Sequence, residues 1–183
     1  MKKIYILNGV GCSGKDTFVT YLSKYVSTYK YSIVDLVKEV AKHLGWDGSK
    51  TEKDRKFLSD LVDLATKYND IPYKDVASIV RDFKNNLIED EVLIIDMRDP
   101  KDIARAVETF GAETILIRNP NVRKIESNHA DRDVENYEYD YIIENDGTLE
   151  QLKKVAEYFV REIICWSDIP GHGKPLVLTC SNY

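Results

Sequence analysis

The chain has 183 residues, which suits one domain with a substantial core and is short for two. Its composition, 43% hydrophobic and 31% charged, is that of a globular protein, and no apolar run approaches the ~20 residues that span a bilayer. The net charge of −5 argues against a general attraction to nucleic acid or anionic membranes, and three widely spaced cysteines indicate no disulfide framework. We therefore expect a cytoplasmic protein.

Short apolar runs alternate with amphipathic segments along most of the chain. Continuous rather than alternating apolar strands predict a parallel sheet covered by helices on both faces. The expected fold class is α/β, a three-layer P-loop NTP hydrolase fold with a five-stranded parallel sheet flanked by helices. The strands are expected at Lys3–Asn8, Tyr31–Val34, Glu91–Asp96, Thr114–Ile117 and Asp140–Glu144. Helices are expected at Asp16–Ser27, Leu36–Leu44, 51–69, Pro72–Asn86, 99–111 and from Thr148 onward.

Turn and capping residues divide these elements. Thr51 with Asp54, and Thr148 with Gln151, have the spacing of capping boxes, while Asp99-Pro100 is an N-cap followed by proline. We expect one P-loop kinase domain over residues 1–165, with the polar segment 119–138 as its lid. Residues 166–183 form a tail of unknown role, for which packing as an extra edge strand and helix end or a place in a partner interface are the alternatives.

The segment Gly9–Asp16 carries the strongest functional signal. It fits G-x-x-x-x-G-K between a strand and a helix, so backbone N–H groups and Lys15 are placed to bind the phosphates of ATP. The alternative is a glycine-rich turn without a ligand. The residues expected to bind the nucleotide here are Gly9, Val10, Gly11, Cys12, Ser13, Gly14, Lys15, Asp16 and Thr17.

Two carboxylates are candidates for binding Mg²⁺. Asp16 stands where a P-loop usually has Ser or Thr, and Asp96 ends an apolar strand, as in a Walker B pattern. Because Asp16 would repel phosphate when no metal is bound, we expect nucleotide binding to depend strongly on Mg²⁺. The alternatives are a plain helix cap for Asp16 and a loop residue for Asp96.

Four arginines are candidates for neutralising the transferred phosphate. Arg98 follows the Asp96 strand, where a guanidinium suits an acceptor phosphate, and Arg118, Arg123 and Arg132 surround the expected lid. We expect Lys15, Arg98, Arg123 and Arg132 to be catalytic. Ordinary surface ion pairs are the alternative for each arginine.

The region Gly45–Arg55 combines Trp46 with Lys50, Lys53 and Arg55. It could bind an acceptor nucleotide, with the indole stacked on a base, or form a charged helix start beside a packed tryptophan. The residues expected to bind the acceptor are Asp35, Lys38, Lys53, Arg55 and Arg98.

The P-loop variant Ser13–Thr17 resembles that of phage-type deoxynucleoside monophosphate kinases. Further segments resemble this group in order, so that the similarity covers roughly residues 3–160; they are Val34–Lys38, Gly45–Gly48 with Lys53–Arg55, Asp96–Arg98 with Pro100, and Asp140–Ile143 with Asn145–Thr148. The resemblance implies a nucleoside-monophosphate-kinase-like fold and transfer of the γ-phosphate of Mg·ATP to a nucleoside monophosphate, with a deoxynucleoside monophosphate favoured. It also implies that Asn145, Gly147 and Thr148 lie against the donor adenine and that Arg98 faces the acceptor phosphate.

Other functions stay open. A dephospho-coenzyme A kinase-like enzyme would phosphorylate a hydroxyl and would need a base, for which Asp35 is the candidate. A non-catalytic nucleotide-binding module is the alternative from another class. The acidic balance disfavours a nucleic-acid-binding ATPase. As partners we expect a small-molecule nucleotide acceptor and neither nucleic acid nor a membrane. The sequence is also compatible with a homodimer.

Overall fold

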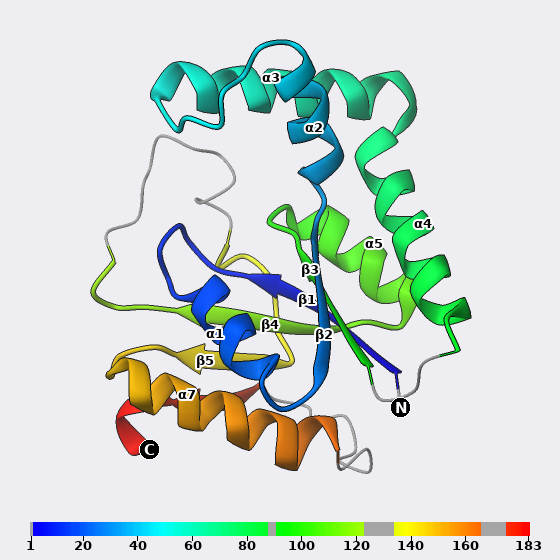
Figure 1. The fold of residues 1–183 in the computed structure, drawn as a ribbon. Coiled ribbons are helices and arrows are strands. Elements are labelled where there is room, and N and C mark those ends of the chain that lie inside the picture. The colour runs from blue at the N-terminus through cyan, green and yellow to red at the C-terminus, as the bar shows by residue number, and fades with distance from the viewer. Residues whose placement is uncertain (1, 88–90, 123–133, 166–174) are drawn as a thin grey trace. The chain divides into compact units, whose positions relative to one another are not determined.

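The computed structural model describes residues 2–87, 91–122, 134–165 and 175–183. The chain forms two compact units, of which the first joins Met1–Lys30 to Ile88–Tyr183 and the second comprises Tyr31–Leu87 (Figure 1). The P-loop belongs to the first unit. No helix in the described parts of the chain is both long enough and apolar enough to span a bilayer.

A sheet organises the first unit. Within the described residues it has six strands in the order β2-β3-β1-β4-β5-β6. Their bounds are β1 Lys2–Asn8, β2 Ser27–Ser32, β3 Glu91–Asp96, β4 Glu113–Arg118, β5 Tyr141–Glu144 and β6 Leu176–Thr179. β1 pairs in parallel with β3 and β4, β4 with β5, and β5 with β6. The parallel sheet is confirmed, but five strands was wrong, because the apolar run Leu176–Thr179 pairs with β5 as an additional strand.

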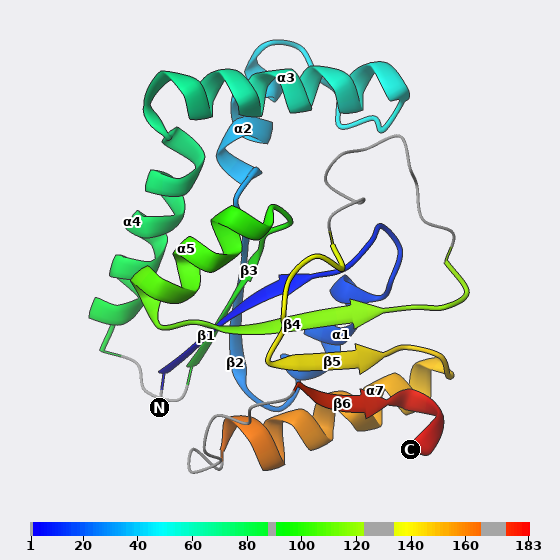
Figure 2. The same cartoon turned by 180° about the vertical axis from the view of Figure 1, so that it is seen from behind.

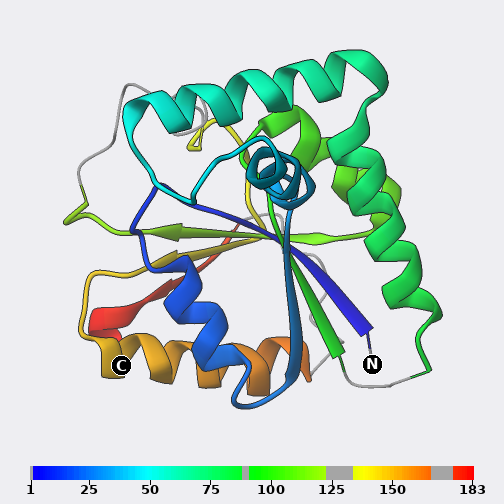
Figure 3. The same ribbon diagram turned by 45° about the horizontal axis from the view of Figure 1, so that its top comes forward.

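Helices cover both faces of this sheet, which confirms the three-layer α/β prediction. α1 (Lys15–Leu22) and α7 (Leu149–Tyr158) lie together on one face, as Figures 1 and 3 show. α5 (Pro100–Phe110) lies against β1 and β4 on the opposite face, which is toward the viewer in Figure 2. η1 (Phe159–Ile164) continues α7 as a π-helix.

An apolar core lies between the sheet and the α1/α7 layer. Tyr5, Phe18 and Phe159 are fully buried in it, and the ring of Phe159 meets the other two edge-on at centroid distances of 5.5 and 5.8 Å. Each such pair adds roughly 0.5–1.5 kcal/mol to the free energy gained by burial. This core anchors the start of α1, and with it the P-loop, to the centre of the sheet.

Two boundaries near the P-loop differ from the sequence predictions. α1 ends at Leu22 rather than at Ser27, and β2 occupies Ser27–Ser32 rather than Tyr31–Val34. The backbone N–H of Ser23 donates to Val19 O and that of Lys24 donates to Tyr21 O, and these bonds end the helix. β2 has no buried residue in its burial pattern, so it offers none of the apolar signal by which a strand is recognised.

Most of the predicted caps are confirmed. Thr51 with Asp54 and Thr148 with Gln151 both form reciprocal capping boxes. Asp99 accepts a hydrogen bond from Lys101 N at the start of α5, and Gly111 ends that helix with a left-handed φ of 67°. Capping is local chemistry, which is why sequence spacing alone identified these helix ends.

The second unit is helical. It contains α2 (Asp35–His43), α3 (Glu52–Asn69) and α4 (Ile71–Asn85), and α3 packs against both of the others. Asp70, with φ of 52°, makes the turn between α3 and α4. α3 has no fully buried residue, although apolar residues recur at helical spacing along it.

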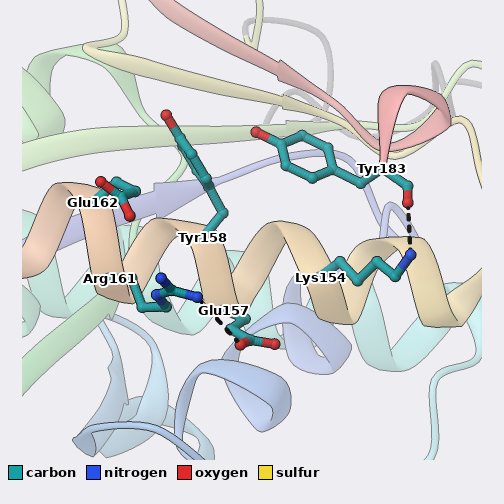
Figure 4. A pocket seen from close by; sticks show the side chains of 6 residues that line it. All are labelled: Lys154, Glu157, Tyr158, Arg161, Glu162 and Tyr183. Atoms are coloured by element: carbon teal, nitrogen blue, oxygen red, sulfur yellow. Dashed lines mark hydrogen bonds and ion pairs between the residues drawn. The ribbon is translucent and has the colours of Figure 1, made fainter.

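The last described segment, residues 175–183, packs within the first unit. After β6, η2 (Cys180–Asn182) leads to Tyr183, whose backbone oxygen accepts a hydrogen bond of 2.9 Å from Lys154 Nζ on α7 (Figure 4). The rings of Tyr158 and Tyr183 lie 5.6 Å apart beside a shallow hollow that Glu157, Arg161 and Glu162 also line. The part of the expected tail that is described thus belongs to the sheet and its helical layer.

Candidate functional site

The carboxyl ends of the parallel strands meet at one edge of the sheet, where open α/β folds bind ligands. Strand register pairs Leu7 with Asp96 and Arg118 with Glu144, so residues at the ends of β1, β3, β4 and β5 are neighbours. The P-loop leaves this edge directly after Asn8. The candidate site is therefore built from strand ends and from the loops that follow them.

The P-loop occupies residues 9–14, between β1 and α1. Gly9 and Gly14 have backbone φ angles of 147° and 107°, values that residues other than glycine rarely adopt. A Cβ on Gly9 would clash with Ile117 O, and one on Gly14 would clash with Asn145 Nδ2. These two glycines let the loop approach its neighbours closely.

Lys15 lies across this loop. Its ammonium donates hydrogen bonds to Gly9 O at 2.6 Å and to Val10 O at 2.9 Å. No side chain caps α1 at Gly14, so the helix begins with backbone N–H groups and a fixed positive charge at the same place. That combination is suited to binding an anion such as the phosphates of a nucleotide.

A buried asparagine supports the start of the P-loop. Asn8 is 1% exposed, its Oδ1 accepts a hydrogen bond of 2.8 Å from Gly9 N, and its Nδ2 donates one of 2.7 Å to Tyr139 Oη. The same Nδ2 lies 3.4 Å from Arg98 O. Burial raises the pKa of Tyr139 to about 12, so its hydroxyl stays protonated and donates to Val134 O at 2.8 Å. Asn8 thus connects the P-loop to two other loops.

The turn after β5 contacts the P-loop from the other side. Asn145 donates from Nδ2 to Ser13 O at 2.9 Å and from its backbone N–H to Arg118 O at 2.7 Å. Asp146 accepts hydrogen bonds from the backbone and hydroxyl of Ser181, at 2.9 and 2.7 Å. Residues Asn145–Thr148 were predicted to lie against a donor base; the structure places Asn145 against Ser13 of the P-loop.

The two predicted metal carboxylates share one cation. Lys30, on β2, forms ion pairs with Asp16 and with Asp96, the latter at 3.0 Å. Asp16 is 90% exposed at the start of α1, whereas the side chain of Asp96 is 22% exposed at the end of β3. The structure therefore brings together Asp16 and Asp96, which are 80 residues apart in the sequence.

The chemistry of this pair fits a magnesium ion. Asp96 Oδ1 is buried and has no hydrogen-bond partner within the described residues, so it is an acceptor in need of a donor or a cation. Burial raises the pKa of Asp96, and the charges of Lys30 and Lys15 oppose that rise. In the described parts of the chain no three His, Cys, Asp or Glu residues gather as a metal site. Mg²⁺ needs no such cage, because it is commonly held by one or two carboxylates, water and the phosphates of a nucleotide.

The predicted arginines have different surroundings. Arg98 is half-buried on the loop after β3, at the sheet edge described above. Arg118 ends β4 and is ion-paired with Glu135 and Glu144; the hydrogen bond to Glu135 is the largest cause of its raised pKa. Arg118 therefore has carboxylate partners within its own unit. Arg123, Arg132 and most of the expected lid lie outside the described residues.

Four of the predicted acceptor residues lie in the second unit. Asp35 accepts a hydrogen bond of 2.9 Å from Ser32 N and forms an ion pair of 2.8 Å with Lys38. Arg55 donates from Nε to Lys50 O at 3.2 Å, near the start of the helix that also carries Lys53.

Trp46, in the same unit, is half-buried and donates from its indole N–H to Ser49 O at 2.9 Å. Its polar edge is thus engaged in its own turn.

Comparison with known proteins finds distant structural alignments. A crystal structure of shikimate kinase from Aquifex aeolicus vf5 aligns with a TM-score of 0.45 and 16% identity, over 87% of this chain and 96% of that one. A de novo designed protein with a P-loop NTPase fold aligns with a TM-score of 0.41 and 15% identity, over 93% and 98%. No protein-family model and no curated protein sequence matches the chain. Similarity at this level assigns neither activity nor substrate.

Three residues of the site were not identified from the sequence. Asn8 gave a usable signal, because a polar residue at the buried end of an apolar strand needs partners. Lys30 gave none, since it lies in a strand without apolar periodicity. Ser181 gave none either, because its contact with Asp146 depends on how a distant segment joins the sheet.

Proposed function

We propose that the chain is an ATP- and Mg²⁺-dependent phosphotransferase whose acceptor is a nucleoside monophosphate. One observation carries the proposal: Lys15 lies across the backbone of a glycine loop at an uncapped helix start. Phosphoryl transfer is catalysed chiefly by positioning and by neutralising negative charge, and these groups can do both.

Each group has a definite task in this proposal. The P-loop N–H groups and the start of α1 hold the donor phosphates, and Lys15 leaves Gly9 O and Val10 O to neutralise the β- and γ-phosphates. Asp16 and Asp96 would hold Mg²⁺, which when bound offsets charge on the phosphates. Asn8 and Asn145 keep the loop in shape from its two sides.

The acceptor class is the finer part of the proposal. It rests on the resemblance of the P-loop and the Asn145–Thr148 turn to those of deoxynucleoside monophosphate kinases. An acceptor phosphate is already an anion, so transfer to it requires no general base. We assign Arg98, at the sheet edge after β3, to that phosphate, where a guanidinium can bind two oxygens at once.

A coupled assay with Mg·ATP tests the proposal. The acceptors are the ribo- and deoxyribonucleoside monophosphates and dephospho-coenzyme A, and Lys15→Ala is the blank. Turnover of a nucleoside monophosphate that is lost in the blank supports the proposal. Turnover of dephospho-coenzyme A alone would instead assign a hydroxyl acceptor, and ATP binding without turnover of any acceptor would favour a non-catalytic module.

A further inference from the structure

Lys30 lies where a bound metal would be expected. It comes from β2, the neighbour of β3 in the sheet, and its ammonium contacts one carboxylate oxygen of Asp16 and one of Asp96. Three elements, the start of α1, β2 and the end of β3, thus converge on a single cation. None of the tasks proposed above for Lys15, Asp16 or Asp96 requires this lysine.

The arrangement has an electrostatic reason. Two carboxylates that face one site repel each other, most strongly when one of them is withdrawn from water. Asp96 is largely buried and Asp16 is exposed, and a cation that contacts both carboxylates offsets their mutual repulsion. The ion pairs with Asp16 on α1 and Asp96 on β3 hold the ammonium of Lys30 in this position.

We propose that Lys30 holds the place of the divalent cation while no nucleotide is bound, so that metal ions enter this site with the nucleotide rather than before it. The inference rests on the proposed function, since it takes Asp16 and Asp96 as the metal-binding carboxylates. Lys30 is then a specificity-determining residue that favours Mg·nucleotide over free Mg²⁺.

The charges of Asp16, Asp96 and Lys30 determine how tightly each ligand binds. A free divalent cation must displace the ammonium or bind beside it, and either event costs electrostatic energy. A nucleotide arriving with its metal brings several negative charges, which offset that cost. Metal-free ATP, in contrast, benefits from Lys30, because the ammonium neutralises part of the carboxylate charge that would repel phosphate. Removing the charge of Lys30 should therefore change the two affinities in opposite directions.

Titration calorimetry of the full chain tests this inference without using turnover. The variants are Lys30→Met and Lys30→Gln, which remove the charge, and Lys30→Arg, which keeps it; circular dichroism confirms that each is folded. Lys24→Met is the matched control, since Lys24 is an exposed lysine of the same unit that contacts the ring of Tyr21. The probes are MgCl₂ alone, MnCl₂ alone, and ATP in EDTA.

We expect nucleotide-free Lys30→Met and Lys30→Gln to bind Mg²⁺ and Mn²⁺ at least about tenfold more tightly than wild type, a change equivalent to ~1.4 kcal/mol. ATP in EDTA should bind these variants more weakly, while Lys30→Arg and Lys24→Met resemble wild type. Unchanged or weaker metal binding in whichever uncharged variant folds would overturn the inference. Because no phosphate transfer is measured, this result is independent of the outcome of the acceptor assay.

Discussion

Asn145 Nδ2 donates a hydrogen bond of 2.9 Å to Ser13 O, and this contact joins the turn after β5 to the P-loop. The two residues are 132 positions apart in the sequence. The carbonyl of Ser13 is therefore directed toward Asn145. The turn that was expected to lie against the base of the nucleotide thus contacts the P-loop through Asn145, and its contact with a base stays a prediction.

Replacing Asn145 by alanine should loosen the loop. The variant leaves Ser13 O without this donor, so we expect the free energy of unfolding to fall by about 1 kcal/mol and the affinity for Mg·ATP to fall by about tenfold. Chemical denaturation and calorimetry measure the two effects. Asn85→Ala, at an exposed asparagine at the end of α4, serves as the control. Unchanged nucleotide affinity in Asn145→Ala would contradict the supporting role.

Glycine is required at Gly9 but not at Gly11. A Cβ on Gly9 would clash with Ile117 O at a φ of 147°, whereas one on Gly11 meets nothing within 4 Å. We expect Gly9→Ala to lower the free energy of unfolding by about 1–3 kcal/mol and Gly11→Ala to change it by less than about 0.5 kcal/mol. Urea denaturation of both variants checks this difference. Equal costs at the two positions would mean that the loop conformation described above is wrong.

Substituting Asp35 distinguishes a phosphate acceptor from a hydroxyl acceptor. Asp35 is paired with Lys38 and accepts from Ser32 N, which are contacts that stabilise a structural carboxylate. Because transfer to a phosphate acceptor needs no general base, we expect Asp35→Asn to keep turnover within about tenfold of wild type. Removing a general base would instead lower turnover by about 10²–10⁴-fold. Steady-state kinetics at saturating Mg·ATP gives the answer. A loss in the larger range, with acceptor binding intact, would point to proton abstraction from a hydroxyl.

The attachment of the C-terminal segment should depend on pH. Hydrogen bonds from the side chain and backbone of Ser181 hold the pKa of Asp146 below its ordinary value of 3.8. A carboxyl whose pKa is lowered in the folded state stabilises that state above the unfolded pKa, and this contribution is lost as the pH falls through the folded pKa. Wild type should therefore have a higher Tm than Asp146→Asn at pH 7, and the gap should close below about pH 3.8. A gap that is constant from pH 7 to pH 3 would show that the charge of Asp146 does not matter.

Local chemistry made much of the fold predictable. Gly9, Gly14 and Lys15 lie within seven residues of one another, and Thr51 with Asp54 satisfies its cap within four, so spacing alone identifies both features. β3 was also predictable from a local pattern, because a strand that is buried on both faces is a continuous hydrophobic stretch.

Contacts that depend on the order of the strands in the sheet could not be predicted from the sequence. Lys30 contacts Asp16 and Asp96 because β2 lies beside β3 in the sheet. β2 has no buried residue, so no apolar pattern in the sequence identifies it as a strand. β6 was not among the five expected strands for a similar reason: the three apolar residues Leu176–Leu178 identify a strand only when they pair with the edge of β5. Asp16 and Asp96 were paired in the prediction because each belongs to a recognisable motif, whereas Lys30 belongs to none and its contact with them depends on strand order.

The most direct test of the proposed activity is ³¹P NMR of Mg·ATP with a nucleoside monophosphate acceptor, in the presence of wild type or Lys15→Ala. The account predicts ADP and a nucleoside diphosphate in equal amounts with wild type, and a rate about 10³–10⁵-fold lower with Lys15→Ala. Lys67→Ala, at an exposed lysine of α3, should leave the rate unchanged. ADP with inorganic phosphate as the only products, or equal rates for wild type and Lys15→Ala, would contradict it.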